Sequence, residues 1–155
     1  VYRHFESLDH LVAVVSYVAR GYLRDALTAA HAAPRKGRTA AQRAHQRMAA
    51  VGRAYIEFAI DEPNLFDTAF TPCPVPPPPE LDGPSAWQVL IDCVDELVAT
   101  GAVPESRRAE APLIAWAGVH GLANILVRRV SPAPLVNDPA IDIVVEALLR
   151  SVEAP

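Results

Sequence analysis

The longest periodic stretch of the chain lies at residues 7–33, SLDHLVAVVSYVARGYLRDALTAAHAA. Its apolar residues recur every three or four positions over five turns, which predicts one long amphipathic helix. Ser7 has the residue type of an N-cap, and Asp9 follows it in the first turn. The pattern fades before Pro34, because proline does not continue a helix. This stretch sets an α-helical pattern that most of the chain repeats.

Five further segments have helical periodicity or a helical start signal. They run from after the polar loop 34–40 to about Asp61, from Pro63 through Phe70, from Pro84 to the C-cap glycine Gly101, from about Ser106 or Glu110 to Arg129, and from Asn137 or Asp138 onward. Residues 71–80, TPCPVPPPPE, predict an extended loop, since this density of proline excludes a helix. No segment predicts a strand. The sequence therefore predicts an all-α domain of about six helices.

Composition bounds the class of protein. The chain has 155 residues, which favours one domain, and 51% of them are hydrophobic, which excludes global disorder. The formal net charge of −4 argues against binding nucleic acid by charge alone. The two cysteines are too few for a disulfide framework and favour the reducing cytoplasm. The longest apolar run, residues 113–119, is far shorter than the roughly 20 residues of a membrane span. We expect a cytoplasmic protein that does not cross a membrane.

Motifs of catalysis are missing from the sequence. It has no glycine-rich phosphate loop, no HExxH, no CxxC and no GxSxG. The two cysteines, Cys73 and Cys93, have no histidine at metal-ligand spacing. The prediction is a protein that is not an enzyme and that needs no cofactor and no metal.

Two polar residues lie on the predicted fifth helix, which is otherwise apolar on all sides. His120 and Asn124 are one turn apart, on the same side as Trp116. A buried polar group without a partner costs about 1–3 kcal/mol, so each is either satisfied within the core or lines a ligand cavity. The candidate ligand-binding residues are Trp116, His120 and Asn124, together with the aromatic residues that could wall such a cavity: Tyr55, Phe58, Phe66, Phe70 and Trp87. Each of these aromatic residues taken alone is also compatible with plain core. With no charge placed inside, the pattern favours a small apolar or neutral aromatic ligand.

The last two predicted helices are the expected surface for self-association. Ala111, Ala115 and Gly118 are small residues on one side of the fifth helix, which permits close approach of another helix. The expected interface adds Leu122 on the same helix and four residues of the strongly amphipathic last helix: Ile141, Val145, Leu148 and Leu149. In a symmetric homodimer these helices would form a four-helix bundle.

Three strings resemble a known family. Tyr2-Arg3-His4-Phe5, followed by the helix start at residues 6–12, resembles the end of the recognition helix and the next helix in TetR-type bacterial repressors. Residues 54–59 with 62–66, AYIEFA and EPNLF, are similar to a segment of the subgroup named for a Trp-His-Gly motif. Trp116-Ala117-Gly118-Val119-His120-Gly121-Leu122 is similar to that motif itself. The family often has Lys where this chain has Leu8, so that contact with the DNA backbone is expected to be absent.

The resemblance implies a TetR C-terminal-domain-like helical bundle at residues 7–155, preceded at residues 1–6 by a remnant of the DNA-recognition helix and turn. Tyr2 and His4 match family positions near the DNA backbone, and operator DNA would be bound only through a missing N-terminal helix-turn-helix domain. The implied function is a transcriptional regulator, a repressor that dimerises and releases DNA when an effector binds. The alternatives are a helical homodimerisation module without effector and a small all-α enzyme or carrier.

Overall fold

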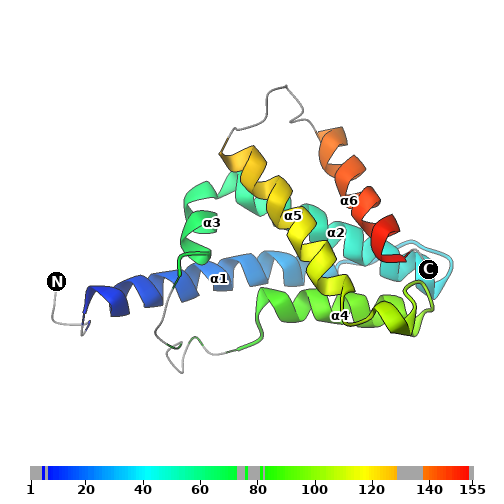
Figure 1. Ribbon diagram of the computed structural model, residues 1–155, viewed down its shortest axis with the longest axis horizontal. Helices are drawn as coiled ribbons and strands as arrows, with labels where there is room; N and C mark the ends of the chain where they lie inside the picture. Colours follow the sequence, from blue (N-terminus) through cyan, green and yellow to red (C-terminus); the bar gives the residue numbers. More distant parts are fainter. Residues whose placement is uncertain are drawn as a thin grey trace.

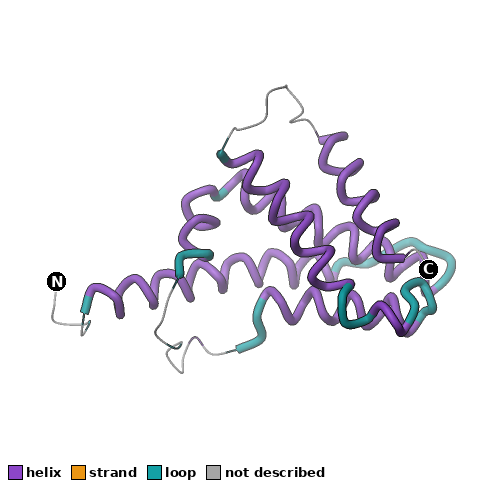
Figure 2. Tube along the Cα trace, in the orientation of Figure 1, coloured by secondary structure: helices purple, strands orange, loops and turns teal. Residues whose placement is uncertain are grey.

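The computed structural model describes residue 5 and residues 7–72, 76, 81, 83–128 and 138–153. In these residues it contains no strand and the following helices: α1 (Leu8–Ala32), α2 (Ala40–Asp61), α3 (Pro63–Ala69), α4 (Ala86–Ala99), the 3₁₀ turn η2 (Glu105–Arg107), α5 (Ala111–Val127) and α6 (Asp138–Glu153). Figure 2 shows this helical content along the whole trace. The predicted all-α fold of about six helices is confirmed. Tyr2, His4 and Asn137 lie outside the described residues.

Local signals in the sequence fix most of the helix ends. The Ser7 hydroxyl accepts a hydrogen bond from the backbone N–H of His10 at 3.1 Å, as expected of an N-cap. At the end of α4, Gly101 has φ +74°, and the N–H of Ala102 donates to the carbonyl of Leu97 at 2.9 Å. This is a glycine-terminated Schellman end, and glycine reaches the positive φ without strain.

Two helix starts refine the predicted boundaries. Helix α4 begins two residues after Pro84, because the Ser85 hydroxyl caps it by accepting from the N–H of Gln88 at 3.2 Å. Helix α5 begins at Ala111 and holds Pro112 in its first turn, where a missing N–H leaves no intrahelical bond unmade. Pro112 therefore marks the start of α5.

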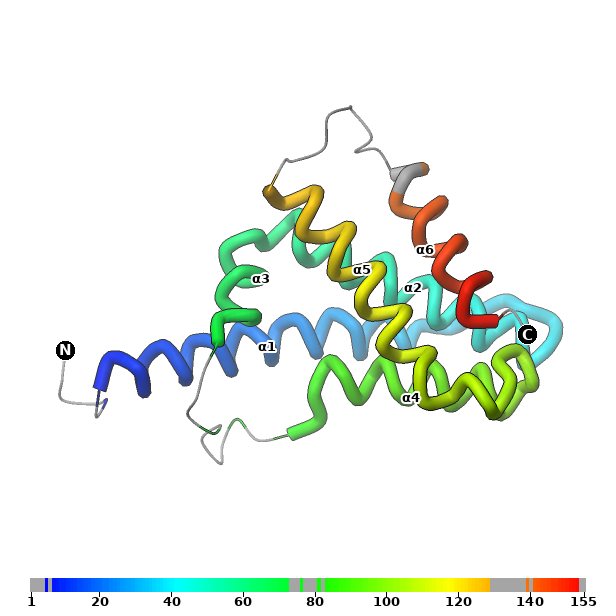
Figure 3. The backbone as a smooth tube through the Cα atoms, viewed as in Figure 1, coloured from blue at the N-terminus to red at the C-terminus, as the bar shows by residue number. Residues whose placement is uncertain are grey.

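Helix α2 is the centre of the bundle and packs against every other helix. Helix α1 runs along it, while α5 and α6 pack on α2 and on each other (Figure 1). The first turns of α1 project beyond the rest of the bundle, at the opposite end of the molecule from the last turn of α6 (Figure 3). The core is formed by inward residues of α1, α2, α4, α5 and α6, among them Leu23, Ile56, Leu97, Ala115 and Val152.

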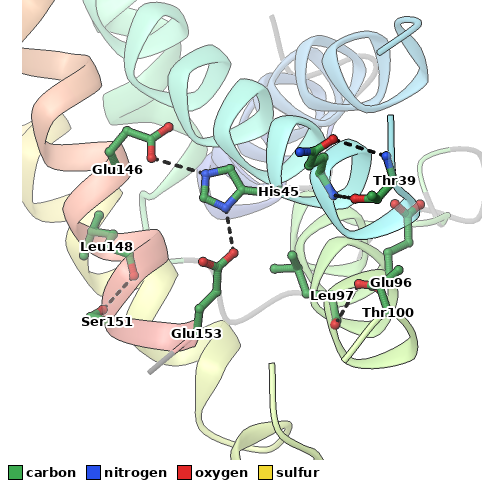
Figure 4. A network of polar contacts seen from close by, with 10 residues as sticks. Thr39, His45, Glu96, Leu97, Thr100, Glu146, Leu148, Ser151 and Glu153 are labelled. Atoms are coloured by element: carbon green, nitrogen blue, oxygen red, sulfur yellow. Dashed lines mark hydrogen bonds and ion pairs between the residues drawn. The ribbon is translucent and has the colours of Figure 1, made fainter. Parts of the chain in front are cut away.

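His45 holds α6 against α2. Its Nδ1 lies 2.7 Å from a carboxylate oxygen of Glu153, and its Nε2 lies 3.2 Å from one of Glu146 (Figure 4). Burial lowers the pKa of His45, but the hydrogen bonds and charges of Glu153 and Glu146 outweigh burial, so the pKa lies above its ordinary value. An ion pair between Arg53 and Asp142 joins the same two helices.

Candidate ligand cavity

A cavity of about 500 Å³ lies between α1, α2, α4, α5 and the C-terminal end of α3. The aliphatic part of its lining includes Leu23 and Leu27 from α1, Met48 and Val51 from α2, and Leu90 from α4. Small-molecule sites in proteins are mostly apolar clefts of roughly 300–1,000 Å³ with a few placed polar groups. The volume of this cavity falls within that range, and most of its lining residues are apolar.

Aromatic side chains form much of the cavity wall. Tyr55, Phe70, Trp87 and Trp116 all line it, and α1 adds Tyr17, which the sequence analysis did not single out. The Trp87 and Trp116 rings meet edge to face, with centroids 6.1 Å apart and an interplanar angle of 89°. Four of the eight side chains predicted to bind a ligand are therefore brought together at one cavity. That they bind one stays a prediction.

The Tyr55 hydroxyl is held by His120. Its oxygen lies 2.7 Å from His120 Nδ1, and Tyr55 is 4% exposed. Burial lowers the pKa of His120 and raises that of Tyr55, so at neutral pH the ring is neutral and the phenol keeps its proton. The hydroxyl and Nδ1 therefore share one hydrogen bond between two neutral groups. The His120 ring also stacks on Trp116, with centroids 5.1 Å apart and planes at 25°.

The other four predicted ligand residues do not line the cavity. His120 contacts two residues of the cavity wall, through its hydrogen bond to Tyr55 and its stacking on Trp116. The Asn124 side-chain amide donates to the His120 backbone carbonyl at 2.9 Å. Phe66 is 1% exposed in the core, with its ring edge to face with Tyr55, and Phe58 packs against the same core. Of the two interpretations offered for His120 and Asn124, the structure supports the satisfied polar pair.

Charge is present at the cavity, contrary to the sequence prediction. Arg20 and Arg24, four residues apart on α1, both line it. Sequence reasoning missed them because they flank the apolar stripe of α1 and look like ordinary solvated positions. The available signal was their place one residue after Ala19 and Leu23, which puts their aliphatic stems beside the buried stripe.

One comparison with known proteins identifies the family. The family described as "Tetracyclin repressor-like, C-terminal domain" matches residues 48–152, which is more than half of the chain. The chain belongs to this family. No curated protein and no solved structure is significantly similar to the chain. The predicted resemblance to the C-terminal domain of TetR-type repressors is thus confirmed, and with it membership of a family of transcriptional regulators.

The predicted dimer residues of this TetR-like domain mostly face the interior of the single chain. Ala111, Ala115, Ile141, Val145 and Leu149 are each at most 5% exposed. The half-buried residues Gly118, Leu122 and Leu148 also pack inward: a Cβ on Gly118 would lie 2.2 Å from the Leu148 side chain, and Leu122 packs against the core. These faces therefore pack within the single chain, and their role in a dimer stays a prediction. The small residues of α5 permit close approach of α6 of the same chain, and periodicity could not show this because α5 is apolar all round.

Among the residues that the structure describes, no group of three His, Cys, Asp or Glu side chains could hold a metal ion. None of the described helices combines the length and the apolarity that crossing a bilayer requires.

Proposed function

We propose that this TetR-like domain is the sensor of a transcriptional repressor, which binds a small molecule in the cavity and releases DNA as a result. The observation that carries the proposal is the cavity itself, about 500 Å³ of space walled by Tyr55, Phe70, Trp87 and Trp116. The space opens to solvent and leaves Phe70 and Trp87 37% and 43% exposed, and exposed apolar surface of this kind marks binding sites. The cavity therefore favours a sensor over a plain dimerisation module.

Helix α1 connects the cavity to the DNA-binding part of the proposed repressor. Residues 17–27 of α1 contribute to the cavity wall, and its N-terminal turns project away from the bundle (Figure 3). DNA would be bound through an N-terminal domain attached before Ser7, as in the family. Two such domains in a dimer must match half-sites about 34–36 Å apart, so a ligand that favours a different position of α1 lowers affinity for DNA. Coupling of this kind is typically about 1–3 kcal/mol.

The proposed homodimer uses the outer faces of α5 and α6. Leu113 and Ile125 of α5 and Ile143 of α6 are large apolar side chains with exposed fractions of 58%, 43% and 66%. Helices α5 and α6 pack side by side, so two copies joined through these faces form a four-helix bundle. This surface differs from the inward faces that the sequence predicted.

The proposed sensor is not an enzyme and acts in the cytoplasm. Among the described residues of the cavity wall there is no Asp, Glu, His or Cys. General acid–base chemistry uses such groups most often, so a binding role is the simpler account of the wall. A small enzyme or carrier is the alternative, and turnover of a bound ligand would show it.

A substitution that fills the cavity tests the proposal. Gly21 lines the cavity on α1, and a Cβ placed there would have only Arg24 Nη2 within 4 Å, at 3.9 Å. Gly21→Phe should occupy the space and also favour the helix, because glycine costs about 1 kcal/mol in a helix interior. Thr28→Phe, at an exposed position of the same helix outside the cavity, is the matched control.

The assay is titration with Nile red, a neutral apolar dye, followed by fluorescence and by thermal unfolding. We expect the dye to bind the unsubstituted chain and Thr28→Phe, and to stabilise both by about 2.7 kcal/mol at 100 times its Kd. We expect Gly21→Phe to bind it at least tenfold more weakly. Equal binding by all three proteins would refute the cavity as the site.

A further inference from the structure

We infer that the ligand of this cavity is an amphipathic organic acid, whose carboxylate is bound by Arg20 and Arg24 while its apolar body lies against the aromatic wall. The inference rests on the proposed function, because it names the chemical class of the effector. It revises the neutral ligand that the sequence favoured.

The charged side chains in the described part of the cavity wall are all positive. Of the described residues that line the cavity, Arg20 and Arg24 are the only charged ones, and both are positive. Their spacing of four residues places the two guanidinium groups on one face of α1, where like charges repel each other. A carboxylate between them would remove that repulsion, whereas a neutral ligand would leave it in place.

Arg20 is held in place by the end of α3. Its Nε donates to the backbone carbonyl of Ala69 at 2.7 Å, and its Nη2 reaches the carbonyl of Thr71 at 3.5 Å. Its Cζ lies 4.9 Å from the centroid of the Tyr17 ring, in a cation–π contact. A guanidinium has five N–H donors, and these two bonds use two of them. The group is thus oriented at the cavity and retains donors for a carboxylate.

Arg24 extends from α1 toward the segment that precedes α4. Its Nη1 lies 3.8 Å from the position of a Cβ on Gly83. Its Nε and Nη2 both donate to one oxygen of Asp25, whose side chain is 66% exposed. Exposed ion pairs contribute little to stability, so a ligand carboxylate can replace Asp25 at small cost.

The rest of the wall fits the body of such an acid. Trp87 and Trp116 come from α4 and α5, so a ligand bound to the arginines of α1 reaches them across the cavity. Aryl groups pack well on such rings. The structure thus offers an anionic subsite and an apolar subsite within one volume of about 500 Å³.

The test is displacement of Nile red by matched pairs of competitors. Each pair is an acid and its neutral amide with the same body: 4-phenylbutanoate with 4-phenylbutanamide, and decanoate with decanamide. The proteins are the unsubstituted chain, Arg24→Gln and the double variant Arg20→Gln/Arg24→Gln. Arg108→Gln is the control, because Arg108 is exposed, lies outside the cavity and loses the same charge.

We expect the acid of at least one pair to displace the dye at about tenfold lower concentration than its amide, from the unsubstituted chain and from Arg108→Gln. Arg24→Gln should remove most of this preference, and the double variant all of it, while Nile red still binds. Raising the ionic strength from about 0.05 M to about 0.5 M should weaken the acid and not the amide.

Other results would separate a failure of this inference from a failure of the proposed function. If the dye binds and is blocked by Gly21→Phe, but no acid displaces it better than its amide, the organic-acid inference is overturned and the sensor proposal stands. A preference for the acid that survives in the double variant also overturns it. If the dye does not bind, or binds Gly21→Phe equally well, the proposed function fails and the inference fails with it.

Discussion

Replacing Tyr55 by phenylalanine removes the hydroxyl that shares a hydrogen bond with His120 Nδ1 at 2.7 Å. A polar group that loses its partner costs about 1–3 kcal/mol when buried. His120 is half-buried, so water can recover part of this, and we expect a loss of about 1–2 kcal/mol. In a domain of this size about 1 kcal/mol shifts Tm by roughly 2–4 °C, so the melting temperature should fall by about 2–8 °C.

A double-mutant cycle with His120→Phe isolates the hydrogen bond. Phenylalanine keeps a ring to pack on Trp116, while the Tyr55 hydroxyl, in a side chain that is 4% exposed, loses its histidine partner. Exchanging both residues for apolar rings removes the hydroxyl and the imidazole together, so the double variant should be less destabilised than the sum of the singles, by about 1 kcal/mol. Urea denaturation measures all four proteins. Additive effects within about 0.3 kcal/mol would refute the pairing on which the wall geometry depends.

Three other predictions concern contacts between helices. Gly118→Ala should lower the free energy of unfolding in urea by about 1–2 kcal/mol, because the new Cβ would clash with the Leu148 side chain and the cost of this clash outweighs the gain in helix propensity. A stabilised variant would contradict this packing. His45→Gln should flatten the pH dependence of Tm, because the folded-state pKa is raised: the stabilisation is fully present below about 6.5 and is lost as pH rises through the folded pKa. If the Tm of His45→Gln depends on pH as that of the unsubstituted chain does, the ion pairs of His45 do not hold α6 against α2. Leu113→Glu, on the exposed face of α5, should convert the dimer to monomers, as measured by sedimentation velocity. The monomer itself should not melt at a lower temperature. A dimer that persists would exclude this face from the interface.

Local chemistry made most of the fold predictable. Ser7 and Gly101 act through bonds to backbone atoms within a few residues, so their residue types are enough to place helix ends. Proline spacing likewise located the starts of α3 and α5 to within a few residues. Periodicity identified α1 and α2, because each has one buried face.

Long-range contacts decided what the sequence could not show. Tyr55 and His120 are 65 residues apart, and the bond from Arg20 to Ala69 spans 49. Nothing in the residue pattern links such positions, so the sequence left open whether His120 meets a core partner or a ligand, and it did not single out Arg20. For α5, apolar on all sides, no pattern distinguishes the face that packs on α6 from the face that remains exposed.

Native mass spectrometry of the chain at micromolar concentration, with saturating Nile red, tests the central claim most directly. A dimeric sensor with this cavity in each chain predicts a dimer that carries up to two dye molecules, and a dimer of Gly21→Phe that carries fewer. A monomer, or a dye content unchanged by Gly21→Phe, would contradict the account.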